Sequence, residues 1–461
     1  MERHVEDTIA GGTWIFLGSL AVSLAGLVFW IVIARLVGVE SLGVASAIVS
    51  SSSIAVTLTS AGLNIAVMRE VAARGVKAFT ASMMLASIMG IAAALIAAIL
   101  TYGVGYQELI PISSLLALIT LVSTLLLSTL VGFEKFRNYF TVVLTGSLAK
   151  MFVGITLAIL GLKILAPLIG YLAYPITSSV IALAILTSVI KRSDNAGIDR
   201  DELRSVALLT FSNYPYVFST QLLTMLSVYV FAYLVGRAVP TGTLYITLMI
   251  TLAIAAIPTS LLSAALPIGT KRGVDPFAES FRIGLGLATP VIAIVLAAPT
   301  TILQIINPEL THGVDTLRIL LLSITPLTAL TAVIIKLNKE GRKGTLALIG
   351  VARLSVLLAL LPTLTSMAGL NGAAVAFLLA NTLVLTYALR REPSITKTLL
   401  TLWCIQVLIA SITYFIHVNE VFLAIIAPLI ALTLTHITNT FTIKDLDVTL
   451  RIVMRALLHM T

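Results

Sequence analysis

Two cations lie in the middle of long apolar segments, and among the residues of this sequence they have the clearest capacity for chemistry. Lys150 lies about midway along the segment 139–160, and Arg353 about midway along the segment 344–363. A charge at the centre of a lipid bilayer costs about 3 kcal/mol or more, so such a side chain usually faces a cavity or a partner. Ammonium and guanidinium groups bind phosphate well. We therefore expect both cations to line a cavity that receives an anionic group.

The carboxylates show the opposite distribution. All 20 aspartates and glutamates fall in loops, in the tails or at the ends of apolar segments. Proton and sodium relays of transporters usually depend on an intramembrane carboxylate, so a carboxylate relay is disfavoured here. The counter-ion of the two cations would then be the substrate, which predicts a phosphate or pyrophosphate head group. The structural alternative is that each cation snorkels or binds a backbone carbonyl.

A second group of candidates consists of amide and phenol side chains within the apolar segments. Such groups can hold sugar hydroxyls, but they also join helices or anchor them at the membrane interface. The group comprises Asn64, Tyr171, Tyr174, Asn213, Tyr214, Tyr216, Gln221 and Tyr229. The residues assigned to a central substrate cleft are Lys150, Arg353, Asn64, Asn213, Tyr214 and Gln221. The Ser50–Ser53 run is expected to serve close approach of helices.

The sequence lacks the spacing of a metal site. Its single cysteine, Cys404, offers no cysteine cluster, and the histidines are scattered over loops and segment ends. These histidines are His4, His312, His417, His436 and His459. We predict no metal, no cofactor and no catalytic residue.

The elements that must position these side chains are membrane-spanning helices. Apolar residues make up 59% of the 461 residues, charged residues only 11%, and the mean hydropathy is +1.08. Soluble domains are roughly half apolar and a quarter charged. The apolar residues fall in blocks of about 18 to 26, long enough to cross a hydrocarbon core of roughly 30 Å. The sequence predicts an all-α polytopic membrane protein.

The apolar blocks predict about fourteen spans. They are 13–35, 43–67, 78–101, 109–131, 139–160, 164–190, 210–236, 243–268, 282–306, 316–337, 344–363, 370–390, 398–416 and 420–440. The boundaries inside 243–306 depend on whether its prolines kink a helix or end one.

Basic residues set the predicted orientation. Of the 29 lysines and arginines, 23 fall at inner positions and 4 in outer loops when the N-terminus is placed inside. By the positive-inside rule both termini are cytoplasmic in the cell membrane. The same asymmetry explains the net charge of +9 without nucleic acid as a partner.

Two halves of the chain resemble each other. The segment ending Val37-Gly38 and followed by Gly43 corresponds to the segment ending Val235-Gly236 and followed by Gly242. Because six helices return the chain to the same side, the repeat predicts two six-helix lobes related by a parallel pseudo-two-fold axis. The predicted domains are 1–190 (N-lobe), 191–205 (cytoplasmic linker), 206–392 (C-lobe), 393–441 (two further helices) and 442–461 (cytoplasmic amphipathic tail).

Several short motifs resemble those of polysaccharide-type flippases of the multidrug/oligosaccharidyl-lipid/polysaccharide (MOP) superfamily. They are Ile33-Ala34-Arg35-Leu36-Val37-Gly38 with Gly43, Ala61-Gly62-Leu63-Asn64 with Arg69, Val131-Gly132-Phe133-Glu134-Lys135-Phe136, and the segment from Ala368 to Ala376. The resemblance implies fourteen helices, two lobes and the flipping of polyprenol-linked oligosaccharides by alternating access. Many members carry an Asp-Arg pair where this chain has Ser227-Val228, so no role of that pair carries over.

Three other functions compete with flipping of a lipid-linked oligosaccharide. Drug and metabolite exporters and lipid II flippases share the fold, but exporters of organic cations typically use buried acids. A membrane glycosyl polymerase or ligase would need a larger outer loop than the dozen or so residues available here. A membrane scaffold fits the repeat and the cations less well. The expected partners are the lipid-linked substrate and the membrane lipids, while a monomeric state and association with glycosyltransferases of the pathway both stay open.

Overall fold

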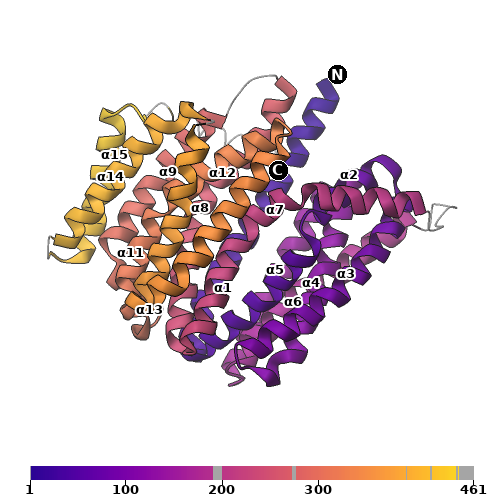
Figure 1. Ribbon diagram of the computed structural model, residues 1–461, viewed down its shortest axis with the longest axis horizontal. Coiled ribbons are helices and arrows are strands. Elements are labelled where there is room, and N and C mark those ends of the chain that lie inside the picture. The colour runs from indigo at the N-terminus through magenta and orange to yellow at the C-terminus, as the bar shows by residue number, and fades with distance from the viewer. Residues whose placement is uncertain are drawn as a thin grey trace. The chain divides into compact units, whose positions relative to one another are not determined.

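The computed structural model describes residues 2–190, 200–272, 277–390, 392–415, 418–442 and 445. Within this part of the chain the structure is helical and has no strand (Figure 1). The first half of the helices is α1 (Glu2–Ser60), α2 (Leu63–Arg74), α3 (Val76–Gly103), η1 (Gln107–Leu109), α4 (Ile110–Gly132), α5 (Phe136–Ile159), α6 (Leu165–Ile190), α7 (Arg200–Val235) and α8 (Ala238–Arg272). The second half is α9 (Phe277–Ala297), α10 (Pro299–Ile306), η2 (Pro308–Gly313), α11 (Val314–Leu322), α12 (Ile324–Lys339), α13 (Lys343–Leu389), η3 (Pro393–Ile395), α14 (Thr396–Phe415) and α15 (Glu420–Ile437).

Length and composition make this a multi-pass membrane protein. Eleven helical stretches in the described residues are long and apolar enough to span a bilayer, and α7 adds a shorter apolar stretch, Leu222–Val235. Two of the eleven, α1 and α13, are much longer than one span and contain non-helical residues at Gly38 and at Ala368 and Gly369. The predicted fold class is confirmed, and the count of fourteen and the two-lobe symmetry stay predictions.

Glycines with positive φ mark the breaks between helices. Gly38 has φ 83° within α1, and Gly236 has φ 63° between α7 and α8. An Ala-Gly-Leu-Asn sequence occurs twice, and in both copies its glycine interrupts the helix, at Gly62 with φ 91° and at Gly369 with φ 55°. Only glycine adopts this left-handed region without a steric penalty. The motifs that carried the resemblance therefore specify where helices turn.

Gly43 and Gly242, which the predicted repeat would make equivalent, pack against each other. A Cβ atom built on Gly43 would lie 1.8 Å from the carbonyl oxygen of Ala238, and one built on Gly242 would lie 2.5 Å from that of Val39. Each glycine thus faces the carbonyl four residues before the other. Any side chain at either position would collide with backbone, so the start of α8 and the helix after Gly38 touch directly.

The chain divides into two compact units. Unit 1 comprises 1–246 and 343–373, and unit 2 comprises 247–342 and 374–461. In unit 1, α5 packs against α6 and α1, and α3 packs against α4 (Figure 1). The core of this unit includes buried side chains of α2, α4 and α5, among them Leu63, Leu121 and Val142.

In unit 2, α9 packs against α12, α14 and α15. A buried hydrogen-bond chain joins three of these helices: Thr325 donates to Gln406 Oε1 at 2.7 Å, and Gln406 Nε2 donates to Thr289 at 3.2 Å. Beyond α15, Asp445 accepts two hydrogen bonds from Arg282 on α9, at 2.7 and 2.9 Å. Polar contacts of unit 2 thus fix helix against helix.

Two predicted segments fall largely outside the described residues. Of the linker 191–205, residues 191–199 lie outside them, and α7 already begins at Arg200. Of the tail 442–461, only Thr442 and Asp445 are described. The domain boundaries from the sequence stay predictions.

Candidate functional site

Glycines on α5 and α6 let the helices around Lys150 pack closely. A Cβ atom on Gly154 would lie 2.5 Å from the Phe29 ring of α1, and one on Gly170 of α6 would lie 2.7 Å from the Cα atom of Gly154. Helices α1 and α6 therefore approach α5 closely at this point. The Lys150 side chain emerges there and is only 5% exposed.

Aromatic rings form the walls around the Lys150 ammonium. Its Nζ atom lies 5.3 Å from the ring centroid of Phe29 and 5.4 Å from that of Tyr171. Trp30 supports both rings, with its own centroid 5.2 Å from Phe29 and 5.8 Å from Tyr171, and contacts Tyr245 edge-on. Ring faces attract cations by roughly 0.5 to 2 kcal/mol, which offsets only part of the cost of burying a charge.

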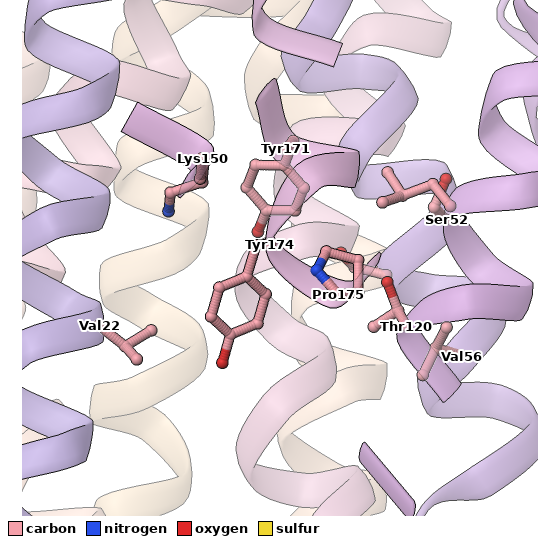
Figure 2. Close-up of a pocket in the computed structure, with 10 residues that line it drawn as sticks. Val22, Ser52, Val56, Thr120, Lys150, Tyr171, Tyr174 and Pro175 are labelled. Atoms are coloured by element: carbon pink, nitrogen blue, oxygen red, sulfur yellow. The ribbon is translucent and has the colours of Figure 1, made fainter. Parts of the chain in front are cut away.

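The ammonium opens into a cavity of about 130 Å³. Its lining residues come from α1, α4, α5 and α6 of unit 1 and are Val22, Ser52, Ser53, Val56, Leu116, Thr120, Lys150, Tyr171, Tyr174 and Pro175. Figure 2 shows Lys150 beside Tyr171, with Tyr174 below them and Ser52 and Thr120 across the cavity. One water needs about 10 to 15 Å³ of such volume, so the cavity has room for several waters or for a polar group of comparable size.

No acidic side chain lines this cavity, and among the described residues no carboxylate pairs with Lys150. The cavity also has hydroxyls that are free to donate. Ser52 donates to the carbonyls of Ile48 and Ser113, at 3.1 and 2.9 Å, whereas the hydroxyls of Ser53, Thr120 and Tyr171 have no hydrogen-bond partner among the described residues. Beside a cation, hydroxyls that can each donate one hydrogen bond suit an anion with several oxygen atoms.

Arg353, the second predicted cation, is also buried. It lies in the part of α13 that belongs to unit 1 and is 3% exposed. It is not among the residues that line the Lys150 cavity. A phosphate site shared by the two cations therefore stays a prediction.

The remaining predicted site residues do not line this cavity either. Asn64 is half-buried on α2, and the Asn213 amide donates to Leu209 of its own helix at 2.9 Å. The Tyr214 hydroxyl donates to the carbonyl of Leu58 at 3.1 Å, which ties α7 to α1. The side chain of Gln221 lies outside the described residues.

Two acids that the sequence places between predicted spans are buried. Glu70 on α2 is 5% exposed, accepts a hydrogen bond from Ser205 at 3.1 Å and forms an ion pair with Arg74 at 3.2 Å. Glu202 on α7 is 8% exposed and lies 4.0 Å from the same arginine. These contacts join α2 to the start of α7, outside the Lys150 cavity.

Sequence reasoning assigned Tyr171 and Tyr174 only a minor claim, gave the serine run a packing role, and missed Thr120. A threonine in an apolar helix usually bonds to its own backbone, so Thr120 gives no signal in the sequence. The signal that was available is the coincidence of a central lysine with two tyrosines spaced three residues apart on the next helix.

A family sequence model described as "Polysaccharide biosynthesis protein" matches residues 32–267, which is more than half of the chain. A search of the curated proteins found no match to the chain.

Solved structures of transporters share the fold. A structure titled "Lipid II flippase MurJ, inward closed conformation" is 16% identical, with a TM-score of 0.69, and the match covers 92% of this chain and 98% of that one. A MATE in complex with MaD3S is 14% identical, with a TM-score of 0.51 over 84% of this chain and 96% of the other. An inward-facing multidrug resistance MATE family transporter of the MOP superfamily is 12% identical, with a TM-score of 0.50 over 83% and 95%. At these identities the likeness concerns the fold.

Proposed function

This chain belongs to the polysaccharide biosynthesis protein family, and from that premise we propose that it is a transporter that flips a lipid-linked oligosaccharide across the cell membrane. Transport proceeds by alternating access and leaves the substrate covalently unchanged. The proposal draws on the family, on the fold shared with transporters of the MOP superfamily, and on one local observation. That observation is the Lys150 cavity.

The cavity supports an anionic substrate. A buried ammonium without a carboxylate partner is costly inside a membrane unless a ligand supplies the counter-charge. The hydroxyls of Ser53, Thr120 and Tyr171 can donate hydrogen bonds to the oxygen atoms of a phosphate. A lipid-linked sugar carries its phosphate between the lipid and the glycan, so a phosphate-binding cavity would hold the substrate at that junction. The glycan is larger than the cavity and would extend beyond it.

We also propose a topology in which both termini and the segment 191–199 lie in the cytoplasm, because basic residues concentrate on that side. Single cysteines at Asn195 and Thr461, in a Cys404→Ser background, should react with an impermeant thiol reagent only after cells are opened. Labelling of either position in intact cells would reverse the topology.

Reconstitution tests the transport itself. Purified protein in vesicles should move a labelled polyprenyl-phosphate-linked or pyrophosphate-linked oligosaccharide between leaflets, as measured by access of a lectin or a hydrolase to the outer leaflet. Movement that equals that of protein-free vesicles for both lipids would refute the proposal.

A matched pair of variants distinguishes an effect of the Lys150 cavity from an effect of losing one positive charge anywhere in the protein. Lys150→Gln should slow movement strongly, whereas Lys163→Gln should leave it unchanged, because Lys163 is an exposed residue between α5 and α6. Lys150→Arg should keep part of the activity, since the charge persists in altered geometry. If Lys150→Gln moves the lipid at the wild-type rate, the Lys150 cavity has no role in transport.

A further inference from the structure

The Lys150 cavity combines one positive charge with several hydrogen-bond donors, and this combination constrains the charge of the ligand. Lys150 is the only lysine, arginine or histidine among the ten lining residues, and no lining residue is acidic. The hydroxyls of Ser53, Thr120 and Tyr171 supply donors but no formal charge. A ligand with one negative charge would be neutralised here, whereas a second charge would have no cation to pair with.

The four donor groups also come from four different helices. Ser53 lies on α1, Thr120 on α4, Lys150 on α5 and Tyr171 on α6. Donors arranged around a cavity suit a tetrahedral group, whose oxygen atoms point in several directions. A carboxylate presents its lone pairs in one plane, so donors that come from four different helices fit it less well.

Building on the proposed function, we infer that the cavity binds a single phosphodiester group, so that one phosphate, and not pyrophosphate, joins lipid and sugar in the preferred substrate. A phosphodiester carries one negative charge and two non-bridging oxygens that accept hydrogen bonds. A pyrophosphate diester carries two negative charges, and burying the second one without a partner is costly. The ammonium of Lys150 pairs with the single charge, and the hydroxyls occupy the remaining lone pairs.

Two lipids that differ by one phosphate test the inference. Vesicles containing the full-length protein are given the same polyprenol and the same neutral glycan, joined either by monophosphate or by pyrophosphate. The monophosphate lipid should move at least about tenfold faster, because an unpaired charge in a partly dehydrated site weakens binding by that order. Equal rates, or faster movement of the pyrophosphate lipid, would overturn the inference and leave the proposed function standing. Movement of neither lipid would refute the proposed function instead.

A variant with a second cation tests the same point from the protein side. Thr120→Lys adds a positive charge to the cavity and should shift the preference towards the pyrophosphate lipid by about tenfold. If Thr120→Lys fails to fold, Ser53→Lys places the charge on another wall, and Lys150→Arg serves as a control that keeps both the charge and the preference. An unchanged preference in a well-folded variant with two cations would contradict the charge argument.

The glycan is another source of a single negative charge. A polyprenyl glycoside that carries a glucuronate and lacks phosphate should therefore be tested beside the two phosphate lipids. It should move at the rate of protein-free vesicles. Movement at the rate of the monophosphate lipid would assign the cavity to a carboxylate and would overturn the inference.

Discussion

Gln406 in unit 2 and Lys150 in unit 1 are both polar side chains buried in apolar surroundings, but their hydrogen bonding differs. Gln406 is fully buried, and both ends of its amide are used, one by Thr325 and the other by Thr289. Lys150 has two aromatic rings beside it and a cavity in front of it, with no acceptor among the described residues. A satisfied buried group holds helices together, whereas an unsatisfied one next to a cavity is available to a ligand.

The largest difference is expected in transport. Lys150→Gln should lower the initial rate of substrate movement by about 30-fold or more, because removing one partner of a buried charge pair usually costs 2 to 5 kcal/mol. Gln406→Leu should stay within about twofold of the wild type per folded molecule, since its partners lie within unit 2. Reconstituted flipping assays at equal protein density compare the two. A loss of transport in Gln406→Leu at normal abundance would show that the buried amide, like Lys150, is needed for transport.

Stability should respond in the opposite order. Gln406→Leu removes two interhelical hydrogen bonds and should lower the free energy of unfolding by about 1 to 2 kcal/mol. Lys150→Gln removes a buried charge that lacks a protein counter-charge and should leave stability unchanged or higher. Thermal unfolding in detergent measures both. A clear destabilisation by Lys150→Gln would show that the ammonium stabilises the fold.

Two adjacent serines allow the same comparison of a bonded and an unbonded polar group within unit 1. Ser52→Ala removes a hydroxyl already bonded to two carbonyls and should cost about 1 kcal/mol of stability with unchanged substrate affinity. Ser53→Ala removes a hydroxyl that lines the cavity without a hydrogen-bond partner among the described residues, and should weaken affinity a few-fold with unchanged stability. Substrate binding and thermal unfolding are measured on both variants. The reverse pattern would place the ligand elsewhere.

The smallest effect is expected at the edge of unit 2. The hydrogen bonds from the Arg282 guanidinium hold the pKa of the Asp445 carboxyl well below its ordinary value. A carboxyl with a lowered pKa in the folded state adds stability above its unfolded pKa and loses it as the pH falls towards the folded pKa. Asp445→Asn should therefore lower the unfolding temperature slightly and equally at pH 7 and pH 5. The difference should shrink only below about pH 4. A difference that already disappears at pH 5 would mean that the pair does not hold the carboxylate ionised.

Much of the fold follows from hydropathy, because spanning length and apolar composition are local properties. The predicted segment ends near Gly38 and Gly369 coincide with non-helical residues, and both positions have positive φ. The start of α7 at Arg200 was not predicted, because charged residues at a helix end look the same as a loop in hydropathy. Glu70 was expected in a loop and Glu202 in the linker, and their burial depends on α2 packing along α7, which the sequence does not show.

The candidate site was predictable only in part. Lys150 could be found because a charge in an apolar segment is conspicuous in any sequence. Ser53 and Thr120 could not be separated from residues such as Ser52, since only tertiary packing decides whether a hydroxyl faces a cavity or a carbonyl. Arg353 was expected to join Lys150 because both are cations in the middle of apolar segments, but the structure places Arg353 outside the lining of this cavity.

The contact between Gly43 and Gly242 makes two distant positions of the chain equally intolerant of a side chain. Each glycine meets the carbonyl four residues before the other, at Ala238 and Val39, so the contact is reciprocal. The two codons can mutate independently, but each backbone excludes a side chain from the other residue. A single substitution at either position is therefore enough to disrupt this helix crossing.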